Sequence, residues 1–222
     1  MKYFDQDFSL FFQELANNNH KEWFHSQKKR YEQKVKAPFL LFLNDFIKAL
    51  DDKGHSLPVT AKDCVLRINR DIRFAKDKSP YNLHVTAFVS AGGRKNKSIP
   101  GIFFRFSGES VGIMIGSFGP SKEQLLAIRK TIAKDVGKFR SIIENDQFKT
   151  GFGEIKGEAH KRIPPEFKAI VEKEPLILNK QFYFVAEREL DLLTGGNLME
   201  TMLDYWEIAQ SFNEYLGNAI KQ

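Results

Sequence analysis

The chain has 222 residues, 42% hydrophobic and 28% charged, a globular composition that excludes a disordered, collagen-like or coiled-coil protein. Its 34 basic and 28 acidic residues give a net charge of +6, a modest excess that suits nucleic acid, anionic lipid or phosphorylated small molecules alike. The single cysteine excludes an intrachain disulfide, and the lack of a long apolar stretch or signal-peptide pattern predicts a cytoplasmic protein without membrane insertion.

The N-terminal part, residues 1–54, is predicted to be helical. Apolar residues within 4–15 recur at the spacing of one face of an amphipathic helix. Asn19 with Glu22 three positions later is the pattern of a capping box, which opens a second helix. Pro38 should interrupt or kink the helical pattern that follows, because proline lacks the backbone donor and crowds the preceding turn.

The middle of the chain, residues 64–117, changes from a helical period to strict alternation, which predicts strands with one apolar face. The last two predicted strands are joined through Gly108 and Glu109, a pair that suits a tight turn. Short connections between consecutive strands favour an antiparallel meander. The predicted strands are 65–74, 81–90, 102–107 and 111–115.

The C-terminal part, residues 121–222, is predicted to be mainly helical. Ser121 with Gln124 forms a second capping-box pattern, and 181–185 alternates like a further strand. No repeat or linker divides the sequence. We therefore expect a single α+β domain over 1–222, with an antiparallel sheet of four to five strands packed by helices from both ends of the chain.

The densest polar run covers the first predicted strand and the loop after it. On a strand, Arg67, Asn69, Asp71 and Arg73 share one face and follow one another at about 6.6 Å. Guanidinium groups beside a carboxylate suit a phosphate or carboxylate ligand, because arginine offers planar, bidentate donors. The alternative is a solvated face with local ion pairs, which is normal for antiparallel sheets.

Two cations are predicted on apolar faces. Arg70 shares a face with Ile68 and Ile72, so it requires a carboxylate partner or the mouth of a cleft. A structural ion pair, or a bulge that redirects the side chain, is the alternative. Lys28 interrupts a helical apolar stripe; either its stem reaches water, or burial lowers its pKa and makes it a base or an anion ligand.

The loop after the first predicted strand is restricted by Pro80, which also pushes Ser79 toward extended geometry. Such a loop presents its side chains rigidly, as a binding site requires, although a well-formed hairpin loop has the same character. His84 follows on the polar face of the second strand and could approach the arginine row. The candidate side chains of the loop are Lys76, Asp77, Lys78 and Tyr81.

Standard motifs for phosphate loops, dinucleotide folds, zinc proteases and nucleophile elbows are absent from the sequence. Nothing in the spacing of Asp71, Asp77 and His84 requires a metal ion, so no metal site is predicted. The sequence does not identify a cofactor.

Two stretches, 18–39 and 67–81, carry a resemblance to a known family. The second reads RINRDIRFAKDKSPY, and both stretches, with a weaker run at 116–129, are similar to the signatures of the domain of unknown function 2461 family. Ala75 and Asn82 depart from the pattern at positions where we expect a small polar and a basic residue. The resemblance supports the choice of site and implies no particular reaction.

The first functional hypothesis is a cleft that binds a small anionic ligand bearing phosphate or carboxylate groups, in an enzyme or a binding protein. Asp71, Asp77 or His84 would then supply acid–base or orienting groups. A nucleic-acid-binding protein and a structural or partner-binding domain without a small ligand are the alternatives, and the oligomeric state stays open. The proposed ligand-binding residues are Lys28, Arg67, Arg70, Arg73, Lys76, Lys78 and Tyr81.

Overall fold

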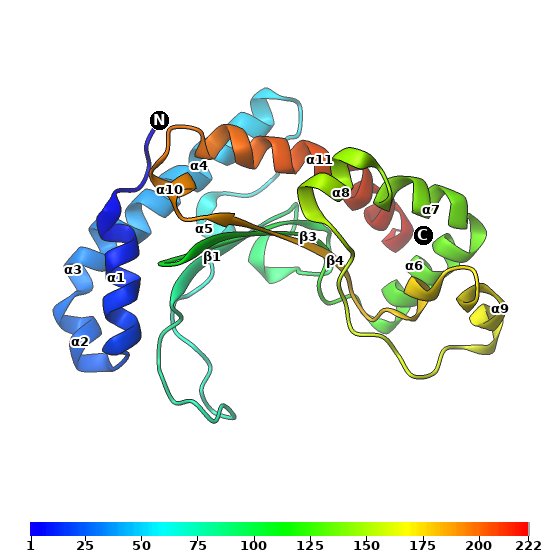
Figure 1. Cartoon of the computed structure of the whole chain (residues 1–222), viewed down its shortest axis with the longest axis horizontal. Helices are drawn as coiled ribbons and strands as arrows, with labels where there is room; N and C mark the ends of the chain where they lie inside the picture. The colour runs from blue at the N-terminus through cyan, green and yellow to red at the C-terminus, as the bar shows by residue number, and fades with distance from the viewer. Residues whose placement is uncertain (222) are drawn as a thin grey trace. The chain divides into compact units, whose positions relative to one another are not determined.

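The computed structural model describes residues 1–221 and has an α+β architecture (Figure 1). Within this part of the chain, one antiparallel sheet has the strand order β1-β2-β3-β4, so strands consecutive in sequence are neighbours in space. The predicted class and the antiparallel meander are confirmed. The strands are β1 (His84–Val89), β2 (Gly101–Ser107), β3 (Ser110–Ser117) and β4 (Phe182–Glu189).

Helices precede the sheet in the sequence, separate β3 from β4, and follow β4. The N-terminal set is α1 (Gln6–Asn17), α2 (Lys21–Ser26), α3 (Lys28–Arg30), the π-helix η1 (Tyr31–Lys36), α4 (Ala37–Asp52) and α5 (Ala61–Cys64), and the short 3-10 helix η2 (Gly93–Lys95) follows β1. The C-terminal set is α6 (Lys122–Lys134), α7 (Val136–Ile143), α8 (Asp146–Phe152), η3 (Pro165–Phe167), α9 (Lys168–Val171), η4 (Pro175–Leu178), α10 (Asp191–Thr194) and α11 (Leu198–Ile220).

The start of the second helix differs from the prediction. His20 caps α2, because its Nδ1 accepts a hydrogen bond from the N–H of Trp23 at 3.4 Å. Asn19, the predicted cap, bonds instead to the backbone of Tyr81, 62 residues away. A tertiary contact therefore overrides the local capping pattern. Pro38 lies in the first turn of α4, directly after the π-helix η1, so the hydrogen-bonding pattern changes at this point while the backbone stays helical.

The first predicted strand, residues 65–74, is wrong. Among the described residues, isolated bridges at Val65 and Asn69 connect this segment to the returning chain, and 65–82 leaves the sheet as a long hairpin, which we call the arm (Figure 1). Phe74, expected on the apolar face, is 96% exposed. Aspartate and lysine side chains bond backbone groups within the arm, and such local bonds compete with a strand ladder.

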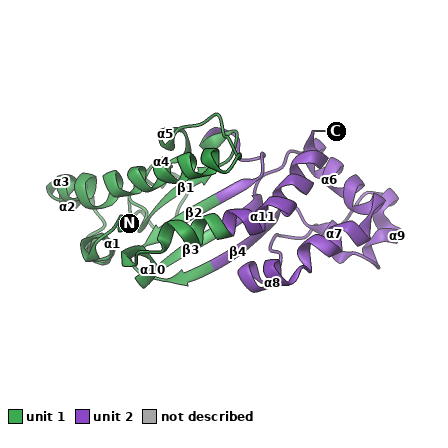
Figure 2. Cartoon of the chain, turned by 90° about the horizontal axis from the view of Figure 1, so that it is seen from above, with its two compact units in different colours: residues 1–94, 103–113, 187–204 green, residues 95–102, 114–186, 205–222 purple. Residues whose placement is uncertain are grey.

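The chain divides into two compact units, each made of separate segments of the sequence (Figure 2). Unit 1 consists of residues 1–94, 103–113 and 187–204, and unit 2 consists of 95–102, 114–186 and 205–222. The residues of β2, β3, β4 and α11 are shared between the two units. The expectation of a single domain stays a prediction.

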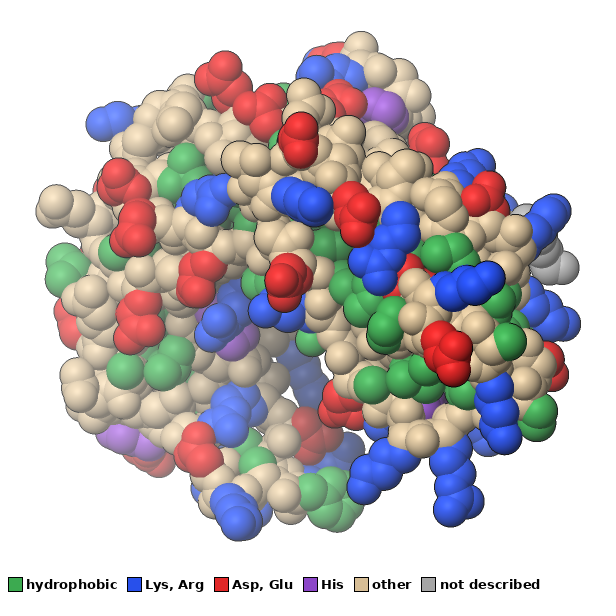
Figure 3. All heavy atoms as spheres, turned by 45° about the vertical axis from the view of Figure 1, so that its right-hand side comes forward, with side chains coloured by type: hydrophobic (Ala, Val, Ile, Leu, Met, Phe, Trp, Pro, Cys, Tyr) green, Lys and Arg blue, Asp and Glu red, His purple; other side chains and the backbone are tan. Residues whose placement is uncertain are grey.

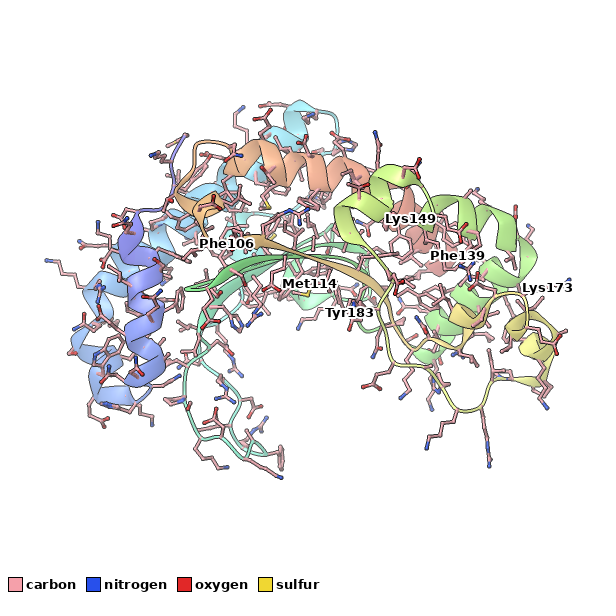
Figure 4. All side chains as sticks on the ribbon, in the orientation of Figure 1. Phe106, Met114, Phe139, Lys149, Lys173 and Tyr183 are labelled. Atoms are coloured by element: carbon pink, nitrogen blue, oxygen red, sulfur yellow. The ribbon has the colours of Figure 1, made fainter. Side chains whose placement is uncertain are left out.

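Phenylalanine rings form the core of unit 1. Phe42 of α4 lies 5.5 Å from Phe104 and 5.4 Å from Phe106, measured between ring centroids, and Phe46 lies 5.1 Å from Phe104. Phe106, labelled in Figure 4, thus lies on the helix-covered face of β2. Because side chains alternate along a strand, Arg105 projects from the opposite face, where it is exposed.

A second group of rings forms the core of unit 2. Phe184 of β4 lies 4.5 Å from Phe148 of α8 and 5.1 Å from Phe212 of α11, between ring centroids. Gly116 in β3 has a φ of +109°, and a Cβ atom there would lie 2.2 Å from the carbonyl oxygen of Phe182. Only glycine fits this close approach of two backbones.

Two further observations bear on the expected environment of the chain. None of the helices within residues 1–221 is both long and apolar enough to cross a membrane. Cys64 is buried at the end of α5, and burial raises the pKa of its thiol to about 11, so the thiol stays protonated at neutral pH. The cytoplasmic location stays a prediction.

Two phenylalanine-to-alanine substitutions test the assignment of core and surface in unit 1. Phe104→Ala should lower the free energy of unfolding by about 3–5 kcal/mol, because the ring is fully buried. Phe74→Ala should change the free energy of unfolding by less than about 0.5 kcal/mol, because that ring is exposed. Denaturant titration followed by circular dichroism measures both, and equal losses would contradict the assignment.

Candidate functional site

The arm is strongly cationic. Residues 65–82 contain five cations and two carboxylates, and six of the seven predicted ligand-binding residues lie there. It begins after α5 and leads directly into β1, so its base is anchored by the sheet. The geometry of the arm therefore decides which of its charges face a ligand and which neutralise one another.

Arg70 and Asp77 form an ion pair inside the arm. Arg70 Nη1 donates to Asp77 Oδ2 at 2.5 Å and to the carbonyl oxygen of Ser79 at 3.0 Å. The other oxygen of Asp77 accepts from the N–H of Ser79 at 2.9 Å and from its hydroxyl at 2.6 Å. These two bonds from Ser79, with the guanidinium of Arg70, hold the pKa of Asp77 far below its usual range. Arg70 thus has a carboxylate partner, as the sequence required, but in the arm rather than in the core.

Asp71 and Arg73 form a second ion pair. Arg73 Nε and Nη2 donate to the two oxygens of Asp71 at 3.0 and 2.7 Å. The hydrogen bonds from Arg73 chiefly lower the pKa of Asp71, and the more distant charge of Arg67 adds to the effect. Arg67, Asp71 and Arg73 are exposed, and of the three only Asp71 and Arg73 form an ion pair with each other. Their predicted contact with a ligand stays a prediction.

The base of the arm is fixed to the helices of unit 1. Asn19 Nδ2 donates to the carbonyl oxygen of Tyr81 at 2.9 Å, and its Oδ1 accepts from the N–H of Tyr81 at 3.1 Å. The ring of Tyr81 stacks on Phe24 of α2, with 4.0 Å between the centroids. Tyr81 is only 6% exposed, and burial raises the pKa of its phenol. Its observed contacts are structural, and its predicted contact with a ligand stays a prediction.

His84 opens β1 next to Arg105 of β2, a residue that the sequence reasoning missed. Burial, and secondly the positive charge of Arg105, lower the pKa of His84 to about 4, so its imidazole is neutral at pH 7. Arg105 is exposed and forms no ion pair with a described residue. It is the one charged residue in the predicted strand 102–107, a signal that could have pointed to it.

The remaining predicted cations are not drawn into one cluster. Lys78 Nζ donates to the carbonyl oxygen of Ile72 at 3.0 Å, across the hairpin. Lys76 is exposed in the arm and Lys28 is exposed at the start of α3, and neither forms an ion pair within residues 1–221. No hydrogen bond in that range connects Lys28 with the arm. Its predicted place in the site is therefore untested.

Residues 7–215 match the model of a family described as conserved hypothetical protein, DUF2461. The chain belongs to the DUF2461 family. The resemblance carried by RINRDIRFAKDKSPY is thereby confirmed, and the match covers almost the whole of the chain. No curated protein matches the sequence. The family assignment places this chain among proteins whose description states no reaction, so the chemistry must be argued from the geometry.

In this DUF2461 protein, the arm and the start of β1 offer unneutralised cations. No three His, Cys, Asp or Glu side chains within residues 1–221 gather into a set that could hold a metal ion. Arg67, Lys76 and Arg105 lack a carboxylate partner among the described residues. Figure 3 shows cationic and acidic side chains interspersed over the visible face, so local pairing matters more than net charge.

The pKa of His84 predicts a pH dependence of stability. The ordinary pKa is 6.5 and the folded-state value is about 4, so the unfolded chain binds the extra proton between these values. The stabilising contribution of the neutral imidazole is present above pH 6.5 and is lost as the pH falls toward 4. The melting temperature of the wild type should therefore fall more steeply across this window than that of His84→Gln.

Arg105→Gln is the matched control for this effect. Removing the neighbouring positive charge should raise the pKa of His84 in an NMR titration, but not to 6.5, because burial is the larger cause of the shift. An unchanged pKa in Arg105→Gln would show that the two side chains do not interact.

Proposed function

We propose that this protein binds a small anionic ligand, bearing phosphate or carboxylate groups, at the arm and the adjoining start of β1. The supporting observation is the charge balance of the arm after pairing. Its two carboxylates are already bound, Asp77 by Arg70 and Asp71 by Arg73. Arg67, Lys76 and Lys78 are left without an anionic partner among the described residues, and a bound anion would neutralise them.

The two ion pairs then stabilise the conformation of the arm around the site. Arg70 joins Asp77 to the backbone of Ser79, so the returning half of the arm is held against the outgoing half. A hairpin fixed in this way holds its free cations at defined positions, which lowers the entropic cost of binding. Arg105 adds a cation at the end of the arm that joins the sheet, beside His84.

His84 suits proton chemistry on such a ligand better than Asp71 or Asp77. The oxygens of both aspartates are occupied by arginine or serine donors, so neither is free to accept a proton from a ligand. The imidazole of His84 is neutral at pH 7, and no described residue within 1–221 donates a hydrogen bond to it. The proposal covers a binding protein and an enzyme alike.

Isothermal titration with pyrophosphate and with citrate tests the proposal. The double variant Arg67→Ala/Lys76→Ala should bind either probe about 10- to 100-fold more weakly, the loss expected for hydrogen bonds to charged groups. Arg105→Ala should weaken binding by about tenfold.

The matched control removes the same charge from unit 2, in the double variant Lys168→Ala/Lys173→Ala (Lys173 is labelled in Figure 4). Equal losses in both double variants would mean that net charge alone attracts the anion. No binding of either probe by the wild type would leave the arm a structural or partner-binding element.

A second candidate function, single-stranded nucleic-acid binding, is favoured by one observation. Phe74 is 96% exposed in the arm, and the guanidinium of Arg73 lies 6.0 Å from its ring centroid. An exposed aromatic ring next to cations offers a stacking surface for a base and donors for the phosphates beside it. A small anion would make no use of Phe74.

Fluorescence anisotropy with labelled oligothymidine and oligouridine at two salt concentrations tests this second function. Phe74→Ala should weaken binding by about 5- to 150-fold, since stacking contributes about 1–3 kcal/mol per base, and Phe74→Trp should restore it. Affinity should fall steeply as salt rises. Pyrophosphate binding that persists in Phe74→Ala while no oligonucleotide binds would exclude the second function and keep the first.

A further inference from the structure

Residues 1–221 contain two buried side chains that carry a full charge, and only one of them has a partner of opposite charge. Glu174 is fully enclosed, and Arg140 Nη2 donates to its Oε1 at 2.9 Å. Arg129 of α6 is 6% exposed, and no carboxylate within residues 1–221 lies at ion-pair distance from its guanidinium. Buried charges in proteins are normally paired, so the charge of Arg129 requires a different partner.

Backbone carbonyl groups satisfy part of the hydrogen bonding of Arg129. Its Nε donates to the carbonyl oxygen of Ile177 at 2.9 Å. Its Nη2 donates to the carbonyl oxygens of Leu178 and Asn179 at 3.4 and 3.2 Å. These oxygens close η4, whose four residues align few peptide dipoles, so the positive charge is only partly offset. Burial lowers the pKa of Arg129, and no carboxylate acts in the opposite direction.

The third nitrogen of this guanidinium is unused. Nη1 of Arg129 donates to no group within residues 1–221, and the protein does not enclose it, so a ligand can reach it. A terminal guanidinium nitrogen carries two N–H donors. Arg129 therefore presents unused donors and an uncompensated charge at the same position.

His160 lies beside the guanidinium of Arg129. Its backbone N–H donates at 2.8 Å to the carbonyl oxygen of Leu178, the same oxygen that accepts from Arg129 Nη2. The segment that carries His160 runs along β4, where Lys156 exchanges two backbone hydrogen bonds with Tyr183 (labelled in Figure 4). Neither ring nitrogen of His160 bonds a residue of 1–221, so the imidazole has a donor to offer to a ligand.

The electrostatic environment of His160 is positive. Burial, and then the charges of Arg129 and Lys180, lower the pKa of its imidazole, which is therefore neutral at pH 7. Lys180 Nζ lies 2.9 Å from Glu158 Oε2, and this carboxylate neutralises the lysine. The charge of Arg129 remains, and an anion next to the guanidinium and the imidazole would offset it.

We propose that Arg129 and His160 bind the phosphate group of a small ligand in unit 2, with Nη1 of the arginine and a ring nitrogen of the histidine donating to its oxygens. A phosphate group has several acceptor oxygens, so it can bridge two donors that do not touch each other. It also carries more negative charge at neutral pH than a carboxylate, which favours it next to a poorly solvated cation. This site goes beyond the function proposed for the arm, because it lies in unit 2 and uses other residues.

NMR of the isotope-labelled full chain, titrated with inorganic phosphate at constant ionic strength, tests this proposal. The amide and imidazole signals at 158–161 and 177–180 should shift saturably. Arg129→Gln should weaken phosphate binding by about 10- to 100-fold, the loss expected for hydrogen bonds to a charged group. His160→Gln should weaken it by about 2- to 10-fold, and this variant decides the question if Arg129→Gln does not fold.

The imidazole of His160 supplies a second measurement. A phosphate group at this site places negative charge next to the ring, so the pKa of His160 should be higher by about 1 in phosphate than in chloride of the same ionic strength. This difference should disappear in Arg129→Gln. An arginine with only a structural role predicts the same pKa of His160 in both salts, and that result would contradict the proposal.

Lys168→Gln is the matched control, because it removes an exposed positive charge from α9 of the same unit and should bind phosphate like the wild type. Three further results would overturn the proposal. They are no saturable shifts at 158–161 and 177–180, equal losses in Arg129→Gln and Lys168→Gln, and binding of acetate as tight as that of phosphate.

The two proposed sites can fail independently. Arg67→Ala/Lys76→Ala should leave the response of 158–161 to phosphate unchanged. Arg129→Gln should leave the response of the arm, residues 65–82, to pyrophosphate unchanged. Loss of one response without the other therefore shows which of the two sites is wrong.

Discussion

The arm depends on the ion pair between Arg70 and Asp77. Two isolated bridges and a few backbone bonds replace a ladder along residues 65–82, so side chains have to hold the two halves of the hairpin together. Arg70 does so by bonding both the carboxylate of Asp77 and the carbonyl oxygen of Ser79. The clamp of Asn19 on Tyr81 performs the same task at the base, where the arm meets α2. Between these two points the arm keeps a defined shape without being a strand.

This arrangement determines the electrostatics of the candidate site. Each carboxylate of the arm is bound by an arginine next to it in space, which leaves the positive charge elsewhere in the arm uncompensated. An exposed ion pair contributes little to stability, so its main effect here is geometric. The ring of Phe74 remains in solvent because no part of the unit 1 core reaches the arm tip. Cations, a free aromatic ring and a neutral imidazole at the base of the arm together make up its recognition chemistry.

Much of the fold could be predicted from the sequence, and the arm could not. Phenylalanines at helical spacing predict α1 and α4 because burying large rings dominates the free energy of those segments. Alternation predicts β2 and β3 for the same reason. In the arm, the alternation of apolar and polar residues matches a strand. Most of the segment, however, has no neighbouring strand in the sheet, and alternation in the sequence does not reveal whether such a neighbour exists. The hydrogen bonds of Asn19 and Arg70 join residues that are 62 and 7 positions apart in the sequence. Patterns of neighbouring residues do not predict such contacts. The sequence points to the candidate residues as a group. Which of them form ion pairs depends on how the arm folds back on itself, and the sequence pattern does not show this.

Because β2, β3 and β4 each contribute residues to both units, the two units cannot be separated by cutting the chain between them. The chain passes from one unit to the other at five places, one within η2 and one within each of β2, β3, β4 and α11. A single break in the polypeptide therefore cannot release either unit whole. Neither unit corresponds to one contiguous gene segment.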